Sequence, residues 1–246
     1  MPSAPQHSNG DGAFPETRWS IVSGARDASD QRRAERALSE LCELYWFPLY
    51  VFVRRRGASP EDAEDAIQGF FLRLIERGDF ATVDAQRGRL RSFLLGSLKN
   101  YLAERHKHAT AQKRGGRFGP ISFDAAEAEQ RYQLEPTDES SPDRLFEKRW
   151  ALTVLESALA ELAAEMQAAG KEEQFTALQP FLAWGSADGG YGEAAARLGS
   201  SESAIRVAVH RLRKRFGVLV QAHIADTVGP EDLQEELAYL RQVVAS

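Results

Sequence analysis

Residues 191–216 read YGEAAARLGSSESAIRVAVHRLRKRF, and this stretch decides the fold class of the second half of the chain. The small residues Ala194 and Ala195 give a short first helix one packing face. Gly199 predicts a sharp turn, because glycine adopts the left-handed conformation that ends many helices. Ser201 predicts the N-cap of a second helix, since its hydroxyl can accept a bond from a free backbone N–H. The pattern is typical of a helix-turn-helix.

The second helix has an apolar and a basic face. Its apolar residues recur at three-to-four spacing and are Ile205, Ala208, Val209, Leu212 and Phe216. Its opposite face carries Ser203, Arg206, Val207, His210, Arg211 and Lys214. The second helix of this motif lies in the DNA major groove, so we predict that these six residues contact DNA. A basic helix that only caps a helical bundle is the alternative.

Composition limits the other classes of function. The net charge is −5 over 246 residues, so any nucleic-acid surface must be local. The single cysteine, Cys42, excludes an internal disulfide and a multi-cysteine zinc site. No apolar run approaches the roughly 20 residues of a membrane span, and the start does not resemble a secretory signal. We expect a cytoplasmic protein without a membrane span.

The first half contains a second basic block. Residues 59–62, SPED, predict a helix start, and the helix should continue to about Arg77 with Asp62, Asp65, Gln68 and Leu72 outside its apolar face. A further helix is predicted from about residue 88 to residue 112. Residues 85–117 hold nine lysines and arginines and one acid, Glu104.

We predict an all-α protein of two small helical domains joined by an acidic flexible linker. The predicted parts are a disordered N-terminus (1–15), a first helical domain (16–116), an extended acidic linker (117–141), a second domain with the helix-turn-helix (142–225) and an acidic helical tail (226–246).

These segments together resemble the extracytoplasmic-function sigma factors of bacterial RNA polymerase. The resemblance covers about residues 35–116 and 145–222, and rests on SPEDAEDAIQGFFLRLIER (59–77), on RGRLRSFLLGSLKNYLAERHKHATAQKRGG (87–116) and on the helix-turn-helix. It implies that one domain binds the polymerase clamp helices and opens the −10 element, while the other reads the −35 element. Core RNA polymerase and promoter DNA are the expected partners, and an anti-sigma factor or other regulator is a further candidate.

The resemblance also implies roles for residues. The expected polymerase-binding residues are Asp62, Asp65, Gln68, Leu72 and Arg73. The expected −10 contacts are Lys99, Asn100, Tyr101, Arg105, Lys107, Lys113 and Arg114. The expected −35 contacts are the six exposed residues of the second helix. The linker corresponds to the connector that follows the RNA path of the polymerase. This chain departs from the family at Gly69, where an acidic residue is usual.

Two other classes stay open. A helix-turn-helix regulator that does not join the polymerase would bind a palindromic duplex by itself. An interaction adaptor with a degenerate motif would show no salt-dependent DNA binding. We expect no catalysis, cofactor or metal, because Glu104 and His108 share one helix face while His106 points away, and no phosphate loop or nucleophile motif occurs.

Overall fold

The computed structural model describes residues 44–77, 89–108, 125–134, 140–182 and 190–245. Every regular element in these ranges is a helix, which confirms the predicted all-α class. The predicted disordered segment 1–15, and Lys113 and Arg114, lie outside the described ranges. Within the described ranges, no helix has the length and apolar character that a membrane crossing needs.

One end of the molecule includes the helical residues 44–55, α3 (Pro60–Arg77) and α5 (Leu90–His108). The chain is helical on both sides of Pro48, which therefore does not end its helix as a proline often does. The start of α3 is as predicted, and its predicted apolar stripe is buried: Ala63, Ile67, Phe70, Phe71 and Leu74.

A helix interrupts the segment that we expected to be an extended linker. Residues of α6 (Ala125–Gln133) pack against the helix over 44–55, with Ala128 buried. Glu129 accepts hydrogen bonds from the Tyr50 hydroxyl and from both Nε and Nη2 of Arg54, the last two at 3.0 and 2.9 Å. The structure thus differs from the prediction here, because acids that suit a solvated linker also suit an arginine on a neighbouring helix.

The remaining helices make up the second half. They are α7 (Pro142–Ala168), α8 (Glu172–Leu178), the short 3-10 helix η2 (Gln179–Leu182), α9 (Tyr191–Arg197), α10 (Glu202–Ala225) and α11 (Leu233–Val244). The helix α7 begins where the predicted second domain starts, and Ser141 caps it by accepting the backbone N–H of Arg144. Gly170, with φ of +68°, follows its end.

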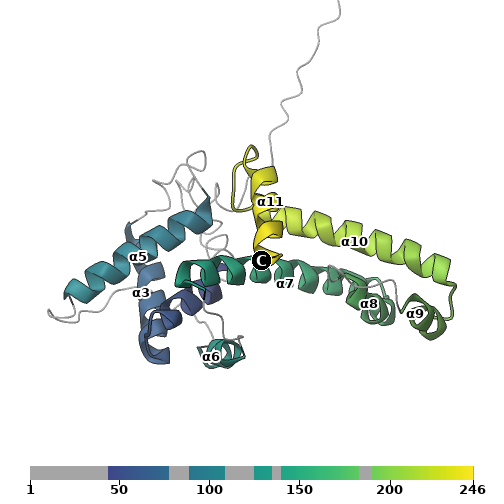
Figure 1. The fold of residues 1–246 in the computed structure, drawn as a ribbon, viewed down its shortest axis with the longest axis horizontal. Helices are drawn as coiled ribbons and strands as arrows, with labels where there is room; N and C mark the ends of the chain where they lie inside the picture. The colour runs from purple at the N-terminus through teal and green to yellow at the C-terminus, as the bar shows by residue number, and fades with distance from the viewer. Residues whose placement is uncertain (1–43, 78–88, 109–124, 135–139, 183–189, 246) are drawn as a thin grey trace, which may run out of the picture.

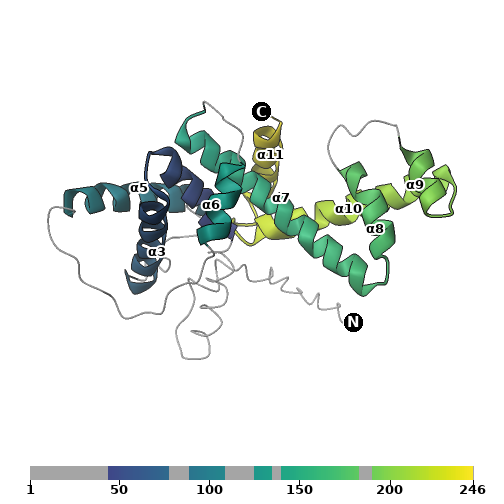
Figure 2. The ribbon, with the colours of Figure 1, turned by 90° about the horizontal axis from the view of Figure 1, so that it is seen from below.

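The long helices α7 and α10 connect the two ends of the molecule (Figures 1 and 2). At 27 residues α7 is about 40 Å long, so its two ends contact different parts of the structure. Its first turns bury Phe146 and Trp150 in the same connected cluster as Tyr45 and Phe47. The buried side chains of both halves therefore belong to one cluster rather than to two separate cores.

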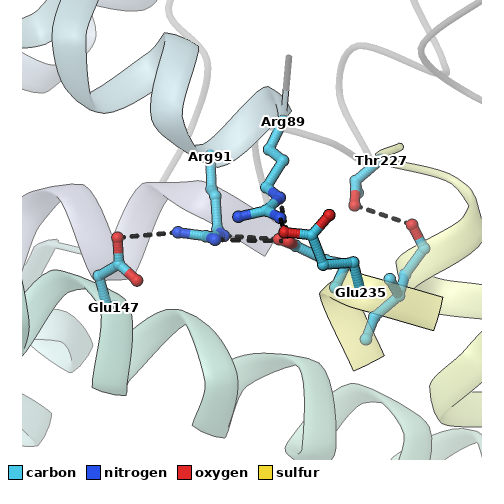
Figure 3. A network of polar contacts seen from close by, with 7 residues as sticks. Arg89, Arg91, Glu147, Thr227 and Glu235 are labelled. Atoms are coloured by element: carbon cyan, nitrogen blue, oxygen red, sulfur yellow. Dashed lines mark hydrogen bonds and ion pairs between the residues drawn. The ribbon is translucent and has the colours of Figure 1, made fainter. Parts of the chain in front are cut away.

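The C-terminal segment returns to the first half (Figure 1). Leu237 and Leu240 of α11 are buried as their spacing predicts. Beside them, Nε of Arg91 on α5 donates a hydrogen bond to Oε1 of Glu236 at 2.5 Å. Both residues are buried, since only 3% of Arg91 and 1% of Glu236 is exposed. Figure 3 shows this network. Arg89, just before α5, also pairs with Glu236, and Glu147 of α7 pairs with Arg91. The predicted tail is thus part of the folded structure.

Candidate nucleic-acid interface

The turn between α9 and α10 has the geometry that the sequence predicts. Gly199 has φ of +58°, in the left-handed region that favours glycine. The backbone N–H of Ser200 donates to the carbonyl oxygen of Ala195 at 2.9 Å, which closes the end of α9. Ser201 then caps α10 by accepting the N–H of Ala204 at 3.3 Å. Local hydrogen bonds therefore fix the angle between the two helices.

The two faces of α10 separate as predicted. Ile205, Val209 and Leu212 are buried against the rest of the second half. All six residues predicted to contact DNA are exposed: Ser203, Arg206, Val207, His210, Arg211 and Lys214. The helix continues nine residues beyond Phe216, to Ala225, where Leu219, Val220 and Ile224 are also buried. The exposed row is consequently carried by a long, rigid element.

Arg206 is oriented by neighbours on both helices of the motif. Its guanidinium lies 4.9 Å from the ring centroid of Tyr191 on α9, and 3.8 Å from the Glu202 carboxylate one turn earlier. Tyr191 in turn stacks on Phe181, with ring centroids 4.7 Å apart. An arginine held in this way loses less side-chain entropy when it binds a base edge or a phosphate.

An apolar side chain stands between the charged groups. Val207 is 50% exposed, an unusual position for valine on a helix with a well-formed buried face. With Ser203 and Arg211 it lines an open hollow of about 650 Å³ that extends to Gln174 of α8. This strip combines hydrogen-bond donors, an acceptor and a methyl surface, the groups that read base edges in a major groove.

The predicted −10 residues on α5 have different surroundings. Asn100 is exposed, Tyr101 and Arg105 are half-buried, and the side chain of Lys107 is not described. Lys99 forms an ion pair with Asp143 in the first turn of α7. A cavity of about 190 Å³ lies beside Asn100 and is lined by residues of α3 and α5: Phe70, Arg73, Leu74, Ser97, Tyr101 and Glu104. Its polar groups include donors and acceptors.

The predicted polymerase-facing residues lie on α3, on the side away from its buried stripe. Asp62 and Asp65 are exposed, but Gln68 and Leu72 are half-buried. Gln68 donates to Glu64 at 2.9 Å, within the same helix. Arg73 is 2.6 Å from Glu104 of α5 and its side chain is 25% exposed, so it joins the two helices rather than facing away from α5. The face is therefore narrower than the sequence suggested.

The basic block of residues 85–117 is not a uniformly free positive surface. Glu235 and Glu236 of α11 bind Arg89, while Glu236 and Glu147 bind Arg91. Burial raises the pKa of the Glu147 carboxyl, which the charge of Arg91 opposes. Sequence reasoning missed this network. The sequence feature that could have revealed it is a charged residue in the apolar stripe of α5 and of α11. Arg91 lies one turn before Leu94, and Glu236 lies one turn before Leu240.

Comparison of this chain with protein-family models, with curated proteins and with solved structures finds no match. In the described residues there is also no group of three or more histidine, cysteine or acidic side chains arranged to hold a metal ion.

Proposed function

We propose that this chain is a sigma factor of bacterial RNA polymerase, of the extracytoplasmic-function type. It binds core polymerase, recognises a promoter through α10 and opens the −10 region with the help of α5. It has no catalysis of its own and works in the cytoplasm with the polymerase. An anti-sigma factor or another regulator is a candidate additional partner.

The exposed row of α10 is the observation that carries the proposal. Arg206, Val207 and Arg211 stand on the outer face of a capped second helix whose inner face is buried. A helix so presented fits the major groove, where arginine can bind guanine and valine can contact a thymine methyl group. Lys214, farther along the helix, suits a backbone phosphate.

The surroundings of Asn100 support a role in strand opening. The cavity of about 190 Å³ beside it has room for a single flipped base, and the Asn100 amide supplies both a donor and an acceptor. Arg105 lies on the same helix, within 4.0 Å of Asp65 of α3. A phosphate that binds Arg105 would have to replace its ion pair with Asp65. That ion pair is weak, because the Asp65 carboxylate is exposed to solvent.

The acids of α3 support the polymerase contact. Asp62 and Asp65 are exposed, and the half-buried Leu72 lies about two helix turns after Asp65 on the same side of α3. Such a face fits a basic and partly apolar helical partner. Glu129 is bound by Arg54 and stabilises the fold, so the further idea that residues 117–141 follow the RNA path is tested on the other acids of that segment. Neutralising those acids without loss of initiation would contradict it.

The direct test is capture of purified core RNA polymerase by the full chain. We expect wild-type binding, and a loss of at least tenfold in affinity for Asp65→Arg, since a like charge then meets a basic partner. Glu173→Arg is the matched control, because it reverses an exposed acid in the first turn of α8. Absence of polymerase binding, together with tight binding of a palindromic duplex, would instead make the protein a conventional helix-turn-helix regulator.

A further inference from the structure

Gly69 occupies a helix position that glycine does not favour. It lies in the middle of α3, and its φ is not among the positive values found at Gly57, Gly170, Gly190 and Gly199. A left-handed conformation therefore does not explain it. Glycine inside a helix lowers helix stability relative to alanine, because it loses more backbone freedom on folding. A different constraint must act at this position.

That constraint is the side chain of Tyr101. A Cβ atom at Gly69 would lie closer than 3.0 Å to the Tyr101 hydroxyl oxygen, a separation that Cβ atoms essentially never show. The next nearest atom, Cζ of the same ring, would be at 3.5 Å, an ordinary contact. The conflict thus involves one oxygen atom. The Tyr101 hydroxyl on α5 therefore lies directly against the backbone of α3 at Gly69.

The ring of Tyr101 is held by two residues of α3 that follow Gly69. Its centroid lies 5.9 Å from that of Phe70 and 5.6 Å from the guanidinium carbon of Arg73. Arg73 in turn pairs with Glu104, one turn after Tyr101 on α5. Moving the Tyr101 hydroxyl off Gly69 would therefore disturb these contacts together.

Tyr101 also connects two surfaces of the proposed function. It follows Asn100 in sequence, and it lines the cavity of about 190 Å³ beside Asn100. At its other end, the hydroxyl reaches α3 next to Gln68, on the helix that carries Asp65. The Tyr101 hydroxyl at Gly69 is therefore one of the contacts that set the position of α5 against α3 and the shape of the cavity.

We propose that Gly69 and Tyr101 form a matched pair in which the missing Cβ of Gly69 seats the Tyr101 hydroxyl and so positions Asn100 and its cavity for an unpaired base. This inference rests on the proposed function. Tyr101 acts in it as a positioning residue rather than as a reader of the base. The glycine that departs from the family pattern is then required by the tyrosine that faces it.

The experiment is a double-mutant cycle in the full chain with Gly69→Ala, Tyr101→Phe and the double variant. Thermal unfolding is measured first, because it does not require polymerase. We expect Gly69→Ala to lower the folding equilibrium constant about 5- to 150-fold, the usual range for overpacking. In the Tyr101→Phe background the same change should be neutral or stabilising, since the offending oxygen is gone. Gly96→Ala on α5 is the matched control, because a Cβ there meets no described atom within 4 Å.

Base capture is measured second, as the fluorescence of 2-aminopurine placed in the −10 region of a promoter bound to core polymerase and this protein. Gly69→Ala should reduce the opening signal, Tyr101→Phe should restore it in the double variant, and −35 duplex binding should stay unchanged in all three. Additive effects in unfolding, or no restoration of opening, would overturn the pairing. If wild-type protein fails to bind polymerase, the proposed function falls and the positioning role falls with it, while a coupled unfolding cycle would still establish the contact itself.

Discussion

The buried ion pair between Arg91 and Glu236 gives the most demanding prediction. Replacing Glu236 by alanine leaves an arginine that is 3% exposed with Glu147 as its remaining close carboxylate in the described network. Two unit charges about 4 Å apart attract by about 4 kcal/mol at an effective dielectric constant of 20. Measured losses on breaking buried pairs are about 3–5 kcal/mol. Because Glu147 still compensates part of the charge, we expect Glu236→Ala to lower the unfolding free energy by about 3 kcal/mol.

The neighbouring carboxylate supplies the control. Glu235 also pairs with Arg89, but its side chain is 71% exposed. Solvent screens such a pair, so Glu235→Ala should change the unfolding free energy by less than about 1 kcal/mol. These two adjacent glutamates of α11 should thus differ severalfold in their contributions to the unfolding free energy.

Urea unfolding followed by tryptophan fluorescence is the assay, since Trp150 lies 5.1 Å from the Arg91 guanidinium. A double variant, Arg91→Met with Glu236→Leu, should recover most of the loss, because an apolar pair avoids the desolvation of two charges. Equal effects of Glu235→Ala and Glu236→Ala would refute the reasoning. So would a loss below about 1 kcal/mol for Glu236→Ala, since that value would place the pair in solvent.

Three further predictions address the other contacts. Hydrogen bonds from Arg54 hold the pKa of Glu129 at about 2, below its ordinary 4.5, so its stabilisation is complete above pH 4.5 and disappears as the pH falls towards 2. Glu129→Gln should therefore lower the unfolding free energy at pH 7 by roughly 1.5–3 kcal/mol, and its difference from wild type should vanish in an acid titration. Gly199→Ala should destabilise the helix-turn-helix by about 1 kcal/mol, because φ is +58°, whereas Gly217→Ala on α10 should not destabilise it. Lys214→Ala should reduce the slope of log affinity against log salt by about 1 for promoter DNA, and an unchanged slope would remove Lys214 from the phosphate contacts.

Periodicity predicted much of the helical framework. The stripe from Ala63 to Leu74 and the helix-turn-helix from Tyr191 were correct in position and in their buried faces. Cap residues marked two helix starts, because Ser59 and Ser201 bond to backbone N–H groups within their own helices. Such signals are local, so they survive without knowledge of any neighbouring element.

The surroundings of charged residues were harder to predict. The basic block on α5 looked like a free surface, yet Arg91 is buried against α7 and α11, and Lys99 pairs with Asp143. The acidic stretch that suggested a linker contains a helix bound to Arg54. The sequence does not show whether a charged side chain is solvated or paired, because the partner of a paired side chain can be more than a hundred residues away.

The sequence by itself determined the all-α class, the helix-turn-helix and the six exposed residues of α10. These follow from residue spacing and caps, which act over one or two helix turns. Only the tertiary structure decided that α11 returns to α5, and that the Tyr101 hydroxyl lies against Gly69. Both contacts depend on the distance between atoms of different helices, and the packing of the whole chain sets that distance.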